Sequence, residues 1–190
     1  MEPANPDSPI ARFVRNADLR NCGATRVVLV DGRSGSGKTF YAAMFAQALD
    51  ATVVHMDDLY PGWDGLDAGI EILARDILLP LSIARPVRYH RWDWANDRWG
   101  DEVDIGVPEM LIVEGTGACS AATLPFSVLS VWVDAPDADR YRRAMERDGR
   151  VYAENWDRWA AQENAHFARE DTRHECSHEI DGLRDWVNDP

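Results

Sequence analysis

One short segment of the chain combines glycines, a lysine and a threonine at a spacing that can hold phosphate. Residues 32–39 read GRSGSGKT and fit the pattern G-x-x-x-x-G-K-[ST]. Glycines let such a loop wrap closely, so backbone N–H groups can point at phosphate oxygens, and a helix that follows adds its positive end. We therefore expect a nucleotide-phosphate site formed by Gly32, Ser34, Gly35, Ser36, Gly37, Lys38 and Thr39.

Lys38 is the one lysine in the sequence, and every other cation among the 20 Lys and Arg residues is an arginine. A compact ammonium on a flexible stem and a planar guanidinium are not interchangeable at such a site. We predict that Lys38 is a catalytic residue that bridges the β- and γ-phosphates of ATP. The hydroxyl of Thr39 is predicted to bind Mg²⁺.

Carboxylates follow three of the apolar segments that we interpret as strands, at Asp57-Asp58, Glu114 and Asp134, and Asp134 is more typical of a cap or turn. Ligands of open parallel sheets bind outside the carboxyl ends of the strands, so these acids should lie near the phosphate loop. Glu114 is predicted to hold Mg²⁺ directly or through water. One of Asp57 and Asp58, preferably Asp57, is predicted to accept the proton of an acceptor hydroxyl, although either could instead cap a helix. The candidate metal ligands are thus Thr39, Glu114 and Asp57.

Arginines crowd the segment 137–150, which we interpret as a helix. Arg143 and Arg147 are four residues apart and therefore share a helix face. Arginines on a mobile lid can stabilise a transferring phosphoryl group, so we predict that this pair is catalytic. The alternative is a solvated helix face whose arginines pair with neighbouring acids.

The order of the elements predicts the fold class. Apolar strands alternate with helices, which predicts an α/β protein with a parallel sheet, the three-layer P-loop nucleoside triphosphate hydrolase fold with a small lid and a hairpin insert. We expect a tail and short helix over 1–25 and a single kinase domain over 26–190, with the hairpin at about 86–106 and the arginine-rich lid at about 137–152. The expected strands are 26–30, 51–56, 110–113, 128–133 and 176–180, and the expected helices are 39–49, 66–81, 137–150 and 153–169.

Together these segments resemble the uridine kinase group of P-loop kinases, which is related to phosphoribulokinase and bacterial pantothenate kinase. The matching pieces are GRSGSGKT, MDDLY, RWDW, LIVEG and WVDAPDADRYRRAMERD, in the family's order. The resemblance implies that Asp57 is the general base, that Tyr60 and Asp93 bind the acceptor, that Glu114 is a Mg²⁺ ligand, and that Arg143 and Arg147 are lid arginines. The chain departs from the family in the short segment 61–67, where the family has a longer element that grips the nucleoside.

These observations favour an ATP- and Mg²⁺-dependent kinase of a small-molecule acceptor, with a nucleoside as the first choice. A sugar, an acid or a coenzyme precursor is the alternative acceptor, and a nucleotide-dependent regulatory protein is the alternative class. A guanine-specific Asn-Lys-x-Asp motif cannot occur, because the one lysine is Lys38. The tryptophans at 63, 92, 94 and 99 could stack on a base or pack against one another, and the sequence favours neither.

Composition bounds the partners. The formal charge of −13 argues against nucleic acid and against an anionic membrane as the main partner. No apolar run is long enough to cross a bilayer, and three cysteines without CxxC spacing are typical of reduced thiols. We therefore expect a cytoplasmic protein, whose oligomeric state the sequence does not predict.

Overall fold

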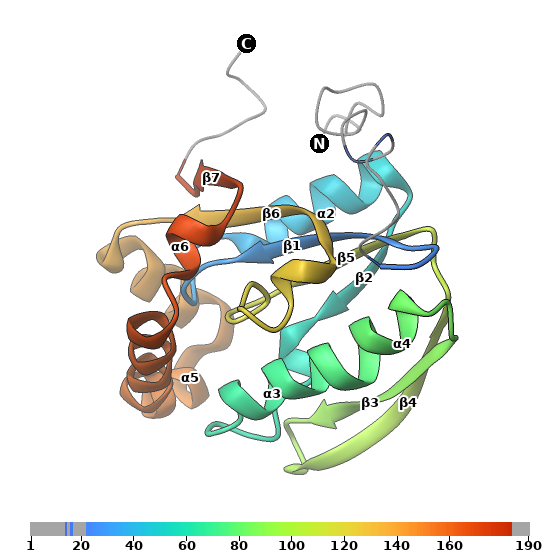
Figure 1. The fold of residues 1–190 in the computed structure, drawn as a ribbon. Coiled ribbons are helices and arrows are strands. Elements are labelled where there is room, and N and C mark those ends of the chain that lie inside the picture. Colours follow the sequence, from blue (N-terminus) through green and yellow to red (C-terminus); the bar gives the residue numbers. More distant parts are fainter. Residues whose placement is uncertain (1–13, 15, 17–21, 184–190) are drawn as a thin grey trace.

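The computed structural model describes residues 14, 16 and 22–183, and the helix expected within 1–25 lies almost entirely outside them. A five-stranded sheet with the strand order β2-β5-β1-β6-β7 forms the centre of the described part, and all its neighbouring strands are parallel (Figure 1). The strands are β1 (Arg26–Asp31), β2 (Thr52–His55), β5 (Met110–Glu114), β6 (Ser127–Asp134) and β7 (His178–Asp181).

Strand β1 shows why the sheet is covered on both faces. Its successive side chains point to opposite faces, so Val27 and Leu29 join one apolar cluster while Val28 and Val30 join the other. Helix α2 (Lys38–Leu49) packs in the second cluster, and the helical segment 66–82 packs in the first (Figure 1). The predicted three-layer α/β architecture with a parallel sheet is confirmed.

The helical segment 66–82 is continuous but irregular. It consists of α3 (Leu66–Ile72), the π-helical turns η3 (Leu73–Leu78) and α4 (Leu79–Ser82). The antiparallel pair β3 (Val87–Asp93) and β4 (Arg98–Gly106) follows it and forms the expected hairpin. In Figure 1 this hairpin lies beyond the 66–82 segment, on the side away from the central sheet.

Helix α5 (Asp137–Arg169) contains the two helices expected from the sequence, joined end to end. They meet at Gly149, whose φ of 60° and ψ of −137° are not helical and suit only glycine well. The first part holds the predicted lid arginines, and the second part extends to α6 (Thr172–Glu175) and β7. Two single turns complete the described elements, η2 (Met56–Asp58) after β2 and η4 (Leu124–Phe126) before β6.

None of the helices in the described part has the length and apolar character needed to cross a membrane.

Candidate active site

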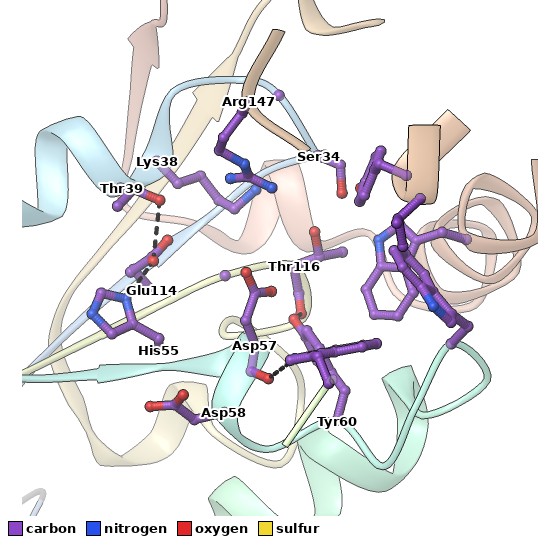
Figure 2. A pocket seen from close by; sticks show the side chains of 17 residues that line it. Ser34, Lys38, Thr39, His55, Asp57, Asp58, Tyr60, Glu114, Thr116 and Arg147 are labelled. Carbon is purple, nitrogen blue, oxygen red and sulfur yellow. Dashed lines mark hydrogen bonds and ion pairs between the residues drawn. The ribbon is translucent and has the colours of Figure 1, made fainter. Parts of the chain in front are cut away.

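A cavity of about 590 Å³ opens at the carboxyl ends of β1, β2 and β5 (Figure 2). Its walls come from the phosphate loop, from the segment 55–63 after β2, from the turn after β5, from the hairpin tip and from α5. This is the edge of a parallel sheet where ligands bind in open α/β folds. The structure therefore brings together residues that lie far apart in the sequence.

The phosphate loop contributes Ser34, Gly35, Lys38 and Thr39 to the cavity wall. The ammonium of Lys38 donates a 3.0 Å hydrogen bond to the carbonyl of Arg33, within the same loop. The other predicted loop residues, Gly32, Ser36 and Gly37, shape the loop without lining the cavity. Gly37 has a φ of 104° at the start of α2, a conformation that glycine adopts readily.

Glu114 is bound to two neighbours through one oxygen. Its Oε1 accepts a 3.2 Å hydrogen bond from the Thr39 hydroxyl and lies 2.7 Å from Nδ1 of His55. Burial alone would raise the pKa of Glu114, but the bond with His55 and the charge of Lys38 bring it below its usual value. The same bond raises the pKa of His55. Glu114 is thus held as a carboxylate beside Thr39, as expected for a metal-binding pair.

Asp57 and Asp58 both line the cavity from η2. Neither side chain is a helix cap, because both lie inside η2, whose N-cap is His55, and the N-cap of the following helix α3 is Gly65. The Asp57 carboxyl is open to the cavity but lies deep among protein atoms, and this desolvation, followed by the charge of Glu114, raises its pKa. Arg147 and Lys38 act in the opposite direction. Desolvation also raises the pKa of Asp58, while Arg91 acts to lower it.

The two predicted lid arginines lie in different places. Arg147 lines the cavity and faces the same space as Lys38 and Asp57 (Figure 2). Arg143 does not, because its guanidinium donates hydrogen bonds to the carbonyls of Ser36 and Gly182, at 3.3 and 3.1 Å. One helical turn earlier on the same face, Arg143 reaches the back of the phosphate loop. In this arrangement Arg143 contacts loop backbone rather than the cavity, and its catalytic role stays a prediction.

The two residues predicted to bind the acceptor also lie in different places. Tyr60 lines the cavity with its ring, but its hydroxyl is committed to the carbonyl of Thr116 at 2.7 Å. Asp93 lies outside the cavity, where its carboxylate accepts hydrogen bonds from Asn96 and from the Ala95 backbone in the hairpin turn. Asp93 lines a second, smaller cavity of about 290 Å³ together with Asp58, and its role beside the acceptor stays a prediction.

Aromatic side chains form the wall of the cavity opposite the metal-binding pair. Trp63 lies at its centre, with ring centroids 5.0 Å from Trp94, 5.4 Å from Tyr152 and 6.3 Å from Trp159, and all four residues line the cavity. The other two tryptophans of the hairpin, Trp92 and Trp99, pack on each other at 5.1 Å. Both pairs thus pack ring against ring, and stacking of a base on Trp63 and Trp94 stays a prediction.

Three polar residues of the site carried no motif in the sequence. His55 binds Glu114, and Asp31 and Glu163 are buried carboxylates that accept backbone hydrogen bonds from Gly32 and Ser34. Asp31 could have been noticed as an acid that ends an apolar strand. Nothing in the sequence separates Glu163 from the other acids of its helix.

Comparisons with known proteins agree with this architecture. No protein-family model matches the chain, and no curated protein matches it. Among solved structures, it is similar to a possible uridine kinase from Bacillus stearothermophilus, with a TM-score of 0.66 and 19% identity over 90% of this chain and 95% of that one. It is also similar to a "putative fructose transport system kinase" from Silicibacter sp. TM1040, with a TM-score of 0.60 and 19% identity over 90% and 97% of the two chains.

The chain therefore shares the three-layer α/β fold of these two solved structures, with its phosphate loop between β1 and α2. The resemblance to the uridine kinase group that its motifs indicate is confirmed at the level of this fold.

Proposed function

We propose that the protein is an ATP-dependent phosphotransferase that moves the γ-phosphate of ATP to a hydroxyl of a small molecule. The observation that carries this proposal is that Lys38, Asp57 and Arg147 face one cavity. A phosphate-binding cation, a carboxylate with a raised pKa and a second cation are the groups that such a transfer needs from the protein.

The cavity has suitable donors for ATP and Mg²⁺. Gly35 and Lys38 line the cavity where the triphosphate would bind. Thr39 offers a hydroxyl and Glu114 a carboxylate oxygen, the hard donors that Mg²⁺ prefers. The described residues contain no cluster of three His, Cys, Asp or Glu that could hold a metal, which fits an ion held by few protein ligands together with substrate phosphates. When bound, Mg²⁺ neutralises charge on the phosphate oxygens.

Charge stabilisation and proton transfer would fall to side chains of this protein. Lys38 and Arg147 stabilise negative charge on the phosphoryl group from two sides. Asp57 accepts the proton of the acceptor hydroxyl at one of its carboxylate oxygens. Its raised pKa makes it a better proton acceptor than a fully solvated aspartate, because the ideal base has a pKa near the working pH.

For the acceptor we propose a nucleoside first. The support is the aromatic wall, where Trp63 and Trp94 offer ring faces on which a planar base can stack. A non-nucleoside acceptor, such as a sugar, an acid or a coenzyme precursor, is the second candidate, because the chain lacks the longer family element after Asp57.

A panel of nucleosides and small hydroxyl compounds tests the proposal, with ADP release over background as the readout and detection of the phosphorylated product as confirmation. Phosphorylation of a nucleoside supports the full proposal. Phosphorylation of another hydroxyl compound supports the kinase and corrects the acceptor. Tight nucleotide binding without transfer to any compound would favour a nucleotide-dependent regulatory protein instead.

A further inference from the structure

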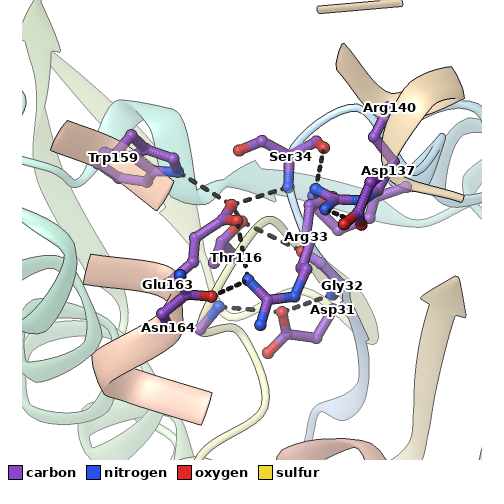
Figure 3. Close-up of polar contacts among 12 residues, drawn as sticks. Asp31, Gly32, Arg33, Ser34, Thr116, Asp137, Arg140, Trp159, Glu163 and Asn164 are labelled. Carbon is purple, nitrogen blue, oxygen red and sulfur yellow. Dashed lines mark hydrogen bonds and ion pairs between the residues drawn. The ribbon is translucent and has the colours of Figure 1, made fainter. Parts of the chain in front are cut away.

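Helix α5 holds both backbone polar groups of Ser34, the phosphate-loop residue at the edge of the cavity (Figure 3). The backbone N–H of Ser34 donates to Glu163 at 2.8 Å, and its carbonyl accepts from Arg140 at 3.1 Å. These partners come from both sides of the break at Gly149, so the loop is held by both parts of α5.

Glu163 is the centre of this arrangement. Its Oε1 accepts hydrogen bonds from Ser34 N at 2.8 Å and from Trp159 Nε1 at 3.1 Å. It also lies 3.2 Å from Thr116 Oγ1, whose single proton is shared with the Gly32 carbonyl at 3.1 Å. Its Oε2 lies 3.6 Å from a guanidinium nitrogen of Arg33, and the side chain is only 2% exposed. A buried carboxylate with this many donors fixes the positions of all of them, because each would be costly to leave unpaired.

The same carboxylate connects the loop to the aromatic wall. Glu163 accepts a hydrogen bond from the indole N–H of Trp159. The ring centroid of Trp159 lies 4.8 Å from that of Tyr60 and 6.3 Å from that of Trp63. All three rings line the cavity. Glu163 therefore sets the position of Ser34 relative to the surface on which the acceptor would lie.

We propose that Glu163 is a positioning residue for the γ-phosphate of ATP, acting through Ser34. The inference rests on the nucleotide site of the proposed function. Ser34 lies on the far side of Arg147 from Thr39 and Glu114 (Figure 2). The phosphoryl group that is transferred must lie between the loop and the acceptor. The loop residue that borders the aromatic wall therefore supports the γ-phosphate rather than the α- and β-phosphates.

Discrimination between ATP and ADP tests this role without any acceptor. Binding of Mg²⁺ with ADP, and with an ATP analogue that has a β–γ imide bridge, is measured by calorimetry for the parent and for Glu163→Gln. The amide keeps one oxygen for the two N–H donors but removes the charge, and hydrogen bonds to charged groups are about twice as strong as neutral ones. We expect the analogue to lose about tenfold in affinity and ADP to lose less than about threefold.

Two further variants make the result specific. Glu163→Ala removes the acceptor altogether, so the preferential loss for the analogue should be larger than in the glutamine variant. Glu170→Gln is the control, because Glu170, directly after the end of α5, also accepts a backbone hydrogen bond, from Ala121 at 2.7 Å, away from the loop. Its ratio of analogue to ADP affinity should equal that of the parent. Melting temperatures of all variants are recorded beside the affinities.

Three results would overturn the inference. Equal losses for both nucleotides in Glu163→Gln would show that Glu163 only maintains the fold. Unchanged affinities would show that Ser34 does not need the charge. A parent protein that binds neither nucleotide would remove the proposed nucleotide site and this role with it, whereas a parent that binds both but phosphorylates no acceptor leaves the test of Glu163 fully valid.

Discussion

The indole nitrogen of Trp94, near the tip of the hairpin, donates a 2.8 Å hydrogen bond to the backbone carbonyl of Asp57. The hairpin therefore touches the candidate base directly, although the two residues are 37 positions apart. The ring of Trp94 also contacts Trp63 in the cavity wall. One side chain thus links the position of Asp57 to the surface where an acceptor ring would stack.

Trp94→Phe should lower turnover while leaving nucleotide affinity unchanged. Phenylalanine keeps most of the aromatic surface but cannot donate the hydrogen bond, whose net value is about 0.5–1.5 kcal/mol. We expect a loss in kcat of about 2- to 12-fold on the acceptor that the panel identifies. Trp99→Phe is the control, since Trp99 packs on Trp92 and does not line the cavity. Similar losses in both variants would contradict a specific role for the Trp94 bond.

Lys38→Ala should abolish transfer, and Lys38→Arg should lose most of it. The Lys38 side chain is only 8% exposed and its ammonium already lies against the carbonyl of Arg33, so the loop encloses it closely. A planar guanidinium is bulkier, and its donors are fixed in one plane. Turnover and ATP affinity of the two variants are the measurements. Near-normal turnover of the arginine variant would contradict the assigned role.

Glu114→Gln should weaken the Mg²⁺ dependence of turnover without unfolding the protein. The amide oxygen can still accept the hydrogen bond from Thr39, but the site loses the negative charge that attracts the ion. We expect the Mg²⁺ concentration that gives half-maximal activity to rise at least about tenfold over that of the parent. Glu109→Gln is the control, because Glu109 is an exposed acid that pairs with Arg26 and does not line the cavity. A Mg²⁺ titration that matches the parent would exclude Glu114 as a ligand.

Asp31 should make the stability of the protein depend on pH. Its fully buried carboxylate accepts hydrogen bonds from the backbone N–H groups of Gly32, Gly117 and Cys119, at 2.6, 3.0 and 2.8 Å. Burial raises its pKa from a usual 3.8 to about 7, against the lowering effect of those bonds. Between these two values the folded protein binds the proton more tightly than the unfolded chain. The free energy of unfolding therefore falls as the pH rises through this range.

Asp31→Asn removes this titration. The parent should lose on the order of a few kcal/mol of stability between about pH 4 and pH 7 relative to the variant, and the difference should be constant above about pH 8. Urea unfolding at several pH values measures it. Asp57 and Asp58 titrate in both proteins, so their contributions cancel in the comparison. Asp31→Asn should also lower the overall stability of the protein. The amide nitrogen that replaces one carboxylate oxygen cannot accept the hydrogen bond from the Cys119 backbone N–H. Parallel pH curves would contradict the raised pKa.

The sequence was sufficient for the parts of the molecule that depend on local patterns. Continuous apolar runs such as 27–30 and 110–113 predicted buried parallel strands, and the loop 32–39 predicted the phosphate site between a strand and a helix. Both patterns express a local cause, because burial on two faces requires apolar side chains throughout and a tight loop requires glycine.

Side-chain direction and long-range pairing could not be predicted in the same way. Arg143 and Arg147 share a helix face, but how α5 docks decides that only Arg147 reaches the cavity. Glu163 lies 129 residues from its partner Ser34, and no local pattern announces that bond. Asp93 fits a family motif, yet its own turn satisfies its carboxylate.

Asp57→Asn should keep ATP affinity and lower phosphoryl transfer. The amide still accepts a hydrogen bond through its oxygen, so part of the acceptor binding survives, but it cannot take a proton at neutral pH. General base catalysis typically contributes about 10²- to 10⁴-fold, so kcat should fall within that range. The measurements are kcat on the identified acceptor and, separately, the affinity for ATP.

Asp58→Asn is the matched control for this prediction. Both carboxylates line the cavity from the same turn, but Asp57 faces the charges of Arg147 and Lys38, whereas Asp58 faces Arg91 of the hairpin. Only the carboxylate beside the phosphate-binding cations can meet an acceptor oxygen as it attacks the γ-phosphate. Asp58→Asn should therefore alter acceptor KM more than kcat. A large loss of kcat at Asp58 with a near-normal Asp57 variant would assign the base to the neighbouring residue, and little loss at either would remove the base from η2 altogether.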